Sequence, residues 1–144
     1  MPVYSKILVP LDNSRSDRAI LEHIRPLAQL TGASLVLVHV ADGFVARNQE
    51  RLNLGESKEM REDRLYLEQL AAEFEAEGFA VTSILEQGEP ATRILATVER
   101  EGCDLIAMAT HGHKFLADVV LGSVADSIRH RTHVPVLMVR AGKG

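Results

Sequence analysis

The feature that most constrains the fold of this chain is the alternation of short apolar runs with longer stretches of helical period. The runs consist mainly of Val, Leu, Ile, Ala and Met. This composition is typical of parallel strands that helices cover on both faces. We therefore expect five buried strands, at residues 7–11, 34–40, 81–85, 105–109 and 134–139.

Between the runs, apolar residues recur every three or four positions, which predicts helices with one buried face. Pro26 should kink or break the first helix, Gly78 should end the second, and Pro90 should begin the third. Ser123 should begin the last helix, with Asp126 completing a capping box. These predictions rest on one apolar stripe for each of the first three helices. The stripes are Ile20, Ile24, Leu27 and Ala28 for the first, Leu67, Leu70, Ala71 and Phe74 for the second, and Ala91, Ile94, Leu95 and Val98 for the third.

The resulting order, βαβαβαβαβ, predicts an α/β fold: one doubly wound, five-stranded parallel sheet with helices on both faces and right-handed crossovers. A length of 144 residues fits one domain, 1–144. The weakly patterned stretch 42–57 is interpreted as a loop that leads into the second helix.

Composition excludes several classes of protein. With 46% hydrophobic and 25% charged residues, the balance is that of a globular protein, while a net charge of −4 argues against a nucleic-acid partner. No run approaches the roughly 20 apolar residues that span a membrane, so no membrane insertion is expected, and the first residues lack an apolar signal core. The single cysteine, Cys103, cannot form an internal disulfide, which favours a cytoplasmic location and a role as a small core residue.

In an open parallel sheet, ligands bind beyond the carboxyl ends of the strands, near the point where the strand order reverses. This rule selects Asp12, the residues after Val40, and the segment after Ala109. Asp12 could accept a hydrogen bond from a ribose hydroxyl or from the amino group of a base. It could equally be a turn residue or the N-cap of the first helix.

The segment after the fourth strand contains Gly112, where a backbone can approach a ligand closely, and Gly122 followed by Ser123. If these last two residues open the final helix, its free N–H groups form an anion site. Ser123 could donate a hydrogen bond to a phosphate, cap its own helix, or do both.

The histidines at 111, 113, 130 and 133 invite a metal interpretation, but no carboxylate or thiolate pattern completes a ligand set, so no metal is expected. A nucleophile elbow, a P-loop and a dinucleotide-binding glycine fingerprint are all missing from the sequence. A hydrolase, kinase or dehydrogenase of those types is therefore not expected.

Taken in order, these segments resemble the universal stress protein family. The resemblance rests on residues 7–14, 35–40, 88–91, 104–112 and 134–139, and is loosest between Asp42 and Gly78. It implies a fold similar to that of the adenine-nucleotide α-hydrolases. It also implies a module for stress response or regulation that has little or no turnover.

The nucleotide-binding branch of that family carries the pattern G-x-x-G, nine residues, then G-[ST]. Gly112, Gly122 and Ser123 match this spacing, whereas Ala109 replaces the first glycine. By resemblance, the ligand is ATP or AMP, and Mg²⁺ can arrive with it. The residues that the resemblance places around this ligand are Pro10, Leu11, Asp12, Val40, Met108, His111, Gly112, Gly122, Ser123 and Val124.

The family also commonly forms homodimers by pairing the last strands of two subunits. Independently, an apolar strand at residues 134–139 that lies at a sheet edge needs a cover or a partner. The alternative function is therefore a dimeric family member that binds no nucleotide and acts in protein interactions. A third class, a nucleotidyl transferase or pyrophosphatase of the related hydrolase group, would need a Ser-Gly-Gly loop or a His-x-Gly-His signature, and the sequence has neither.

Overall fold

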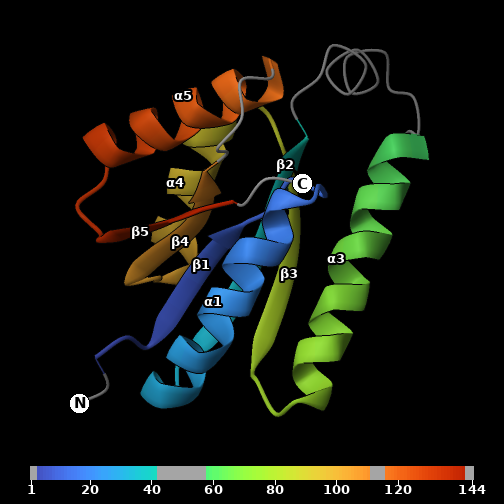
Figure 1. The fold of residues 1–144 in the computed structure, drawn as a ribbon, viewed down its shortest axis with the longest axis vertical. Coiled ribbons are helices and arrows are strands. Elements are labelled where there is room, and N and C mark those ends of the chain that lie inside the picture. Colours follow the sequence, from blue (N-terminus) through green and yellow to red (C-terminus); the bar gives the residue numbers. More distant parts are fainter. Residues whose placement is uncertain (1–2, 42–57, 111–115, 142–144) are drawn as a thin grey trace.

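The computed structural model describes residues 3–41, 58–110 and 116–141, with only the backbone described for residues 116–123 (Figure 1). Strands and helices alternate along these residues, as the sequence predicted. Their order is β1 (Lys6–Pro10), α1 (Ser16–Thr31), β2 (Ser34–Ala41), α3 (Lys58–Ala76), β3 (Val81–Gln87), α4 (Pro90–Glu101), β4 (Leu105–Thr110), α5 (Leu116–Arg131) and β5 (Val136–Arg140).

The five strands form one sheet in the order β3-β2-β1-β4-β5, and every pair of neighbours is parallel. The chain runs outward from β1 through β2 to β3, then crosses back and adds β4 and β5 on the other side of β1. The strand order therefore reverses between β1 and β4. This arrangement confirms the predicted doubly wound fold.

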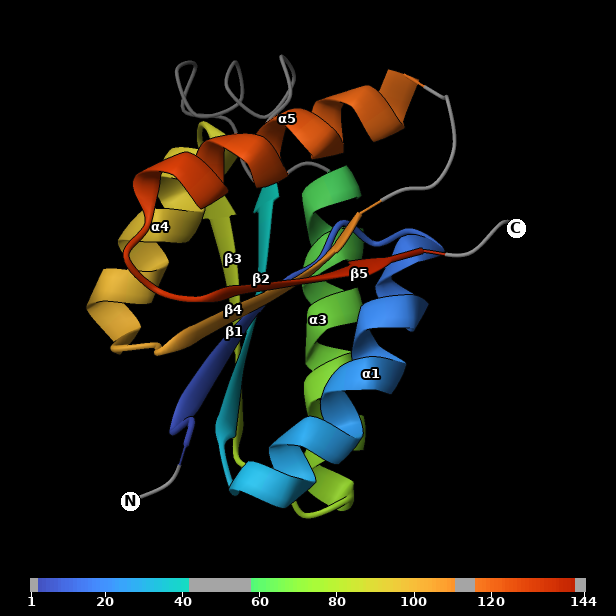
Figure 2. The same ribbon diagram turned by 60° about the vertical axis from the view of Figure 1, so that its left-hand side comes forward.

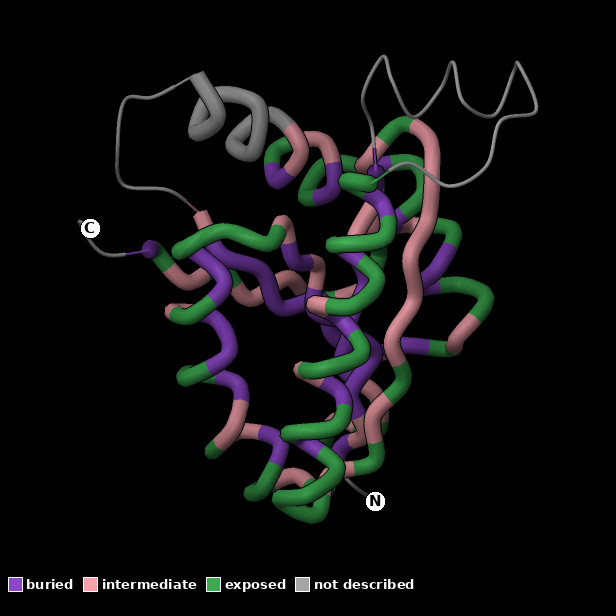
Figure 3. The backbone as a smooth tube through the Cα atoms, turned by 90° about the vertical axis from the view of Figure 1, so that its right-hand side faces the viewer, coloured by how far each residue is buried: buried purple, intermediate pink, exposed green. Residues whose placement is uncertain are grey.

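The helices cover the sheet in two layers, with α1 and α3 on one face and α4 and α5 on the other (Figure 2). Successive side chains of a strand point to opposite faces. Accordingly, Ile7 and Val9 of β1 pack with the α1 and α3 side, and Leu8 packs with the α4 and α5 side. All three are fully buried, so β1 lies at the centre of the core. Figure 3 shows that the buried residues concentrate inside the fold and the exposed ones on its outer surface.

The expectation of five strands buried on both faces is wrong for the two edge strands. Most residues of β3 are only half-buried, and Met138 of β5 is 37% exposed. The strand order explains this, because within the described residues β3 and β5 each have a neighbouring strand on one side only. Continuous burial is a property of the central strands β1, β2 and β4.

Pro26 does not end the first helix, contrary to one of the two expected outcomes, since α1 continues to Thr31. Proline leaves the carbonyl four residues earlier, that of Glu22, without an intrahelical donor. Both Pro26 and Glu22 are exposed, so water can satisfy that carbonyl. The helix ends at Gly32, which adopts the left-handed conformation with φ of 73°.

The last helix begins at Leu116 and not at Ser123, so the predicted N-cap at Ser123 is wrong. Residues 116–121 are Leu, Ala, Asp, Val, Val and Leu, none of which breaks a helix. A single internal glycine, Gly122, costs only about 1 kcal/mol relative to alanine, which a packed helix tolerates. The predicted boundaries at Pro90 and Gly78 are confirmed, because α4 begins at Pro90 and α3 ends just before Gly78. Within the described residues, no helix combines the length and the hydrophobicity needed to cross a membrane.

Candidate functional site

A pocket lies at the carboxyl ends of β1, β2 and β4, beside the point where the strand order reverses. Its wall combines aliphatic side chains with a few polar groups, the composition common in small-molecule sites. The lining residues are Pro10, Leu11, Asp12, Ser16, Asp17, Val38, His39, Val40, Pro90, Ile94, Met108, Ala109 and Val124. The location is the one that ligands occupy in open parallel sheets.

The structure brings together every predicted site residue whose side chain it describes: Pro10, Leu11, Asp12, Val40, Met108 and Val124 all line this pocket. Such a surface suits a flat heterocycle held between aliphatic groups, with Asp12 as a hydrogen-bond acceptor at one end. His111 and Gly112 lie outside the described residues. Gly122 and Ser123 belong to α5, where only the backbone is described.

Asp12 is not the N-cap of α1, which removes one of the two structural interpretations of this residue. The N-cap position is Arg15, and it makes no side-chain capping hydrogen bond. The Asp12 carboxylate instead accepts hydrogen bonds from the hydroxyls of Ser14, at 2.5 Å, and Ser16, at 3.4 Å. Asp12 thus organises the short loop between β1 and α1 and also lines the pocket.

Asp17, in the first turn of α1, holds the backbone of this loop through hydrogen bonds to its side chain. Its carboxylate accepts hydrogen bonds from the backbone N–H of Asp12, at 3.1 Å, and of Asn13, at 2.9 Å. It also accepts a hydrogen bond of 2.6 Å from the hydroxyl of Tyr66 on α3. Three donors therefore converge on one side chain that is only 3% exposed.

Burial raises the pKa of Asp17 to about 6, because removing a carboxylate from water disfavours its charged form. The hydrogen bonds from Tyr66 and from the Asp12 N–H act in the opposite direction, and the nearby Asp12 carboxylate raises the pKa further. Burial also raises the pKa of Tyr66, and its hydrogen bond to Asp17 adds to this effect. Tyr66 therefore remains a neutral donor.

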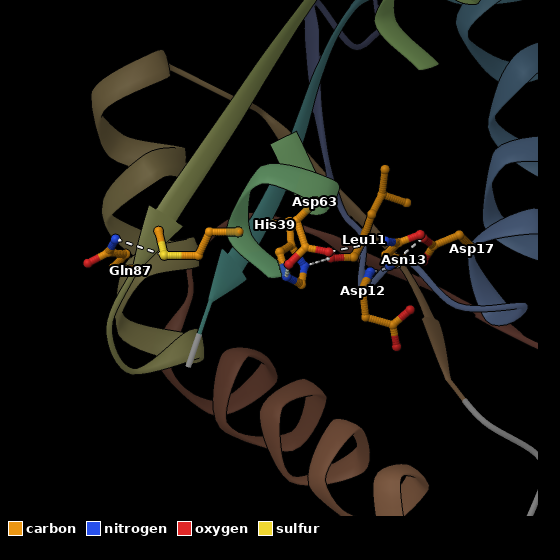
Figure 4. Close-up of polar contacts among 8 residues, drawn as sticks. Leu11, Asp12, Asn13, Asp17, His39, Asp63 and Gln87 are labelled. Carbon is orange, nitrogen blue, oxygen red and sulfur yellow. Dashed lines mark hydrogen bonds and ion pairs between the residues drawn. The ribbon is translucent and has the colours of Figure 1, made fainter. Parts of the chain in front are cut away.

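His39, near the end of β2, and Asp63, on α3, contribute a second polar group beside the loop (Figure 4). His39 Nδ1 lies 2.7 Å from the carbonyl oxygen of Leu11, and Nε2 lies 3.1 Å from Asp63 Oδ2. The other oxygen of Asp63, Oδ1, accepts a hydrogen bond of 3.1 Å from Asn13 Nδ2. Asn13 has a positive φ of 61°, a conformation that asparagine adopts more readily than most residues.

Sequence reasoning missed Asp17, His39, Asp63 and Tyr66, although a signal for two of them is present. The buried stripe of α3 extends back from Leu67 by one helical turn to Asp63, and that of α1 extends back from Ile20 to Asp17. A carboxylate at a core-facing helical position needs partners inside the protein. Extending both stripes toward the helix starts would therefore have predicted two internal polar contacts.

In the part of the chain that the structure describes, no three His, Cys, Asp or Glu side chains gather closely enough to hold a metal ion. Of the four histidines that invited the metal interpretation, His111 and His113 lie outside the described residues. His130 lies on α5 and contacts the backbone carbonyl of Asp126 at 2.8 Å.

Comparison with known proteins identifies the family. The model of the universal stress protein family matches residues 3–140. The universal stress protein MJ0577 of Methanocaldococcus jannaschii is 30% identical over an alignment of length 155, which covers 96% of each chain. The solved structure of MJ0577 superposes with a TM-score of 0.80 at 31% identity, covering 98% of this chain and 99% of that one.

Two further solved structures share the fold at 18% identity and a TM-score of 0.69. One is the universal stress protein from Archaeoglobus fulgidus in complex with dAMP, covering 95% of this chain and 98% of its own. The other is a universal stress protein in complex with cAMP, covering 96% and 98%. The family match over residues 3–140 and the MJ0577 alignment show that this chain belongs to the universal stress protein family.

Proposed function

We propose that this protein binds an adenine nucleotide, ATP or AMP, in the pocket at the carboxyl ends of β1, β2 and β4. The observation that carries the proposal is the pocket itself: it lies at the reversal of the strand order, and Asp12 shares its wall with aliphatic side chains. Family members of the same fold are solved with dAMP and cAMP, which supports this ligand class.

The base and the ribose fit the described part of the pocket. Val40, Met108 and Val124 offer an apolar surface for the adenine ring. The Asp12 carboxylate can accept hydrogen bonds from the ribose hydroxyls or from the exocyclic amino group, both of which are donors. The phosphates would extend toward the glycine pattern formed by Gly112 and Gly122, with Mg²⁺ arriving as part of the nucleotide complex.

The proposed role is binding without appreciable turnover, as a stress-response or regulatory module. A general base needs an uncommitted lone pair close to the reacting atom. Both ring nitrogens of His39 already contact protein groups, and Asp17 accepts three hydrogen bonds. His39 and Asp17 thus serve to shape the pocket.

Two observations favour a second candidate, a dimeric interaction module that binds no nucleotide. Ala109 lines the pocket where the family pattern has glycine, and Met138 leaves apolar surface exposed on the edge strand β5. An exposed apolar strand edge is a site for pairing with another chain. The two candidates differ in whether the isolated protein binds ATP or AMP.

The test has two parts, release of bound nucleotide and titration with added nucleotide. Mass spectrometry of the supernatant from purified, denatured protein should detect ATP or AMP. In calorimetric titrations, Asp12→Asn should weaken ATP binding about tenfold or more, because it replaces an acceptor oxygen by a donor. Glu22→Gln is the matched control, since Glu22 is exposed on α1, pairs with Arg18 and does not line the pocket.

The parent protein and Glu22→Gln should bind ATP equally. If neither the parent nor Ala109→Gly binds ATP or AMP, nucleotide binding is excluded and the interaction module is favoured. A turnover rate for ATP within the ordinary enzyme range of about 1–10³ s⁻¹ would contradict the binding-only role.

A further inference from the structure

His39 lies between two oxygen atoms that belong to different elements. The carbonyl oxygen of Leu11 lies 2.7 Å from Nδ1, and the carboxylate oxygen Oδ2 of Asp63 lies 3.1 Å from Nε2 (Figure 4). The side chains of His39 and Asp63 are 14% and 11% exposed. Little water therefore competes for either contact.

The two contacts of His39 indicate where its ring protons lie. A backbone carbonyl only accepts hydrogen bonds, so Nδ1 must carry a hydrogen. In a neutral imidazole Nε2 then carries a lone pair, which would face the lone pairs of an ionised carboxylate. The contact is attractive only when one additional proton lies between Nε2 and Asp63, and imidazole, the stronger base, holds it. The pair is then an imidazolium and a carboxylate joined by a charge-assisted hydrogen bond.

This pair is connected to both neighbours of Asp12 in the chain. His39 donates to the carbonyl of Leu11, and Asp63 accepts from the side chain of Asn13. Asn13 also keeps its left-handed backbone conformation here, with φ of 61°. One carboxylate on α3 thereby fixes the residues before and after the group that is proposed to contact the nucleotide.

We propose that His39 and Asp63 are positioning residues that hold the Leu11–Asn13 loop for nucleotide binding. The inference rests on the proposed function, because its effect is read through Asp12. It assigns a part in setting nucleotide affinity to α3, a helix to which none of the lining residues named above belongs.

The other charged groups around His39 have partners of their own. Asp17 accepts hydrogen bonds from Tyr66 and from two backbone N–H groups, and Asp12 accepts from Ser14 and Ser16. On β3, Glu86 follows Leu85, the register partner of His39, and pairs with Arg100 at 3.3 Å. Asp63 is therefore the acidic group whose contact with His39 needs the shared proton.

Asp63→Asn provides a discriminating variant because it satisfies the same contacts without the additional proton. The oxygen of the new amide can accept from Asn13, and its NH₂ group can donate to Nε2 of a neutral His39. The shape of the side chain is retained, so the loop should keep its position. Asp63→Ala removes both contacts and should weaken ATP binding at every pH.

Calorimetric titrations with ATP at neutral pH compare these proteins. Asp63→Ala should bind ATP about tenfold more weakly than the parent, because the loop loses both contacts. Asp63→Asn should bind ATP nearly as well as the parent, because its amide restores both contacts. This rescue by the conservative variant distinguishes a positioning role from a general loss of folding. His23→Gln, at an exposed histidine of α1, is the control and should bind ATP as the parent does.

Nitrogen-15 NMR of the ring supplies a readout that does not depend on nucleotide. His39 of the parent should carry hydrogen on Nδ1, the nitrogen that faces the carbonyl oxygen of Leu11. Hydrogen on Nε2 alone would overturn the arrangement on which the positioning role rests. ATP binding by Asp63→Ala as tight as that of the parent would overturn the positioning role alone. No ATP binding by the parent would overturn the proposed function and the positioning role together.

Discussion

Tyr66 of α3 donates a hydrogen bond of 2.6 Å to Asp17 of α1, joining two helices whose contacting residues are 49 positions apart in the sequence. Asp17 in turn accepts hydrogen bonds from the backbone of Asp12 and Asn13. The hydroxyl of Tyr66 is therefore linked, through the side chain of Asp17 alone, to the loop that lines the pocket. This contact lies among buried side chains, where an unpaired carboxylate would be costly.

We predict that Tyr66→Phe lowers the free energy of unfolding by about 1.5–3 kcal/mol, the range for a hydrogen bond to a charged group. The ring continues to pack, so the loss reports the hydroxyl. The pKa of Asp17 should rise further above 6, because the hydrogen bond from Tyr66 lowers it. Urea denaturation measures the first effect. Tyr4→Phe is the control, since among the described residues the Tyr4 hydroxyl makes no hydrogen bond; an equal loss there would contradict the prediction.

Asp17 should make stability depend on pH in mildly acidic solution. Its pKa is about 6 in the folded protein against an ordinary value of 3.8, so between these values the folded state binds more protons than the unfolded state. The free energy of unfolding contributed by this group therefore falls as pH rises from about 4 to about 6, by on the order of 3 kcal/mol. The contribution is fully present below pH 3.8 and lost above pH 6.

Asp17→Asn removes this titration and isolates it from that of other acids. The difference in unfolding free energy, parent minus variant, should decrease between about pH 4 and about pH 6 and stay constant above. Denaturant titrations at several pH values measure this difference. Parallel curves for the two proteins across the range would show that Asp17 titrates normally.

The fold could be predicted because its signals are local and repeated. Five apolar runs with helical stretches between them leave few architectures, and the rule for ligand positions in such sheets then selects Asp12 and the ends of β2 and β4. The extents of burial on β3 and β5 could not be predicted, since an apolar run in the sequence does not indicate whether its strand lies at the centre or at the edge of the sheet. The predicted start of α5 was wrong because the sequence shows the free-energy cost of Gly122 in a helix but not the packing of the helix that offsets this cost.

The polar contacts among Asp17, Tyr66, His39 and Asp63 were not predicted, for a different reason. Tyr66 and Asp17, or His39 and Asp63, are brought together only by the packing of α3 against α1 and β2. Each of these residues alone is compatible with an exposed helix face or a strand end. The need for these contacts follows only from the placement of the helices, because a carboxylate that becomes buried requires hydrogen-bond donors within reach.

The edge strand β5 leads to a prediction about assembly. Met138 is 37% exposed on a strand whose outer edge has no neighbour within the described sheet, and the family relation favours pairing there. We predict a homodimer at micromolar concentration, with sedimentation at twice the mass of one chain, and dissociation on Met138→Lys. Leu30→Lys makes the same exchange at a residue of α1 that is 84% exposed and should leave the dimer intact. A parent protein that sediments as a monomer would refute the prediction.

Gly122 lies inside α5, and the proposed site places it beside the phosphates of the nucleotide. The observed helix and the proposed site predict opposite effects for Gly122→Ala. Stability should rise by about 1 kcal/mol, because alanine is the better helix former. ATP binding should weaken, because a methyl group obstructs close approach of the backbone. Thermal denaturation and calorimetric titration measure the two effects, and a variant that is both less stable and unchanged in affinity would contradict both.

The alanine that departs from the family pattern provides the last prediction. Ala109 is a buried residue of β4 that lines the pocket, at the position of the first glycine. Ala109→Gly should tighten ATP binding by removing a methyl group from the wall. It should also cost about 0.5–1 kcal/mol of stability, because glycine weakens a strand. Ala107→Gly is a close control: it lies on the same strand and the same face of the sheet, is fully buried, and does not line the pocket. It should lose similar stability without any gain in affinity. If both variants bind ATP as the parent does, the methyl group of Ala109 does not limit the site, and the pattern tolerates alanine there.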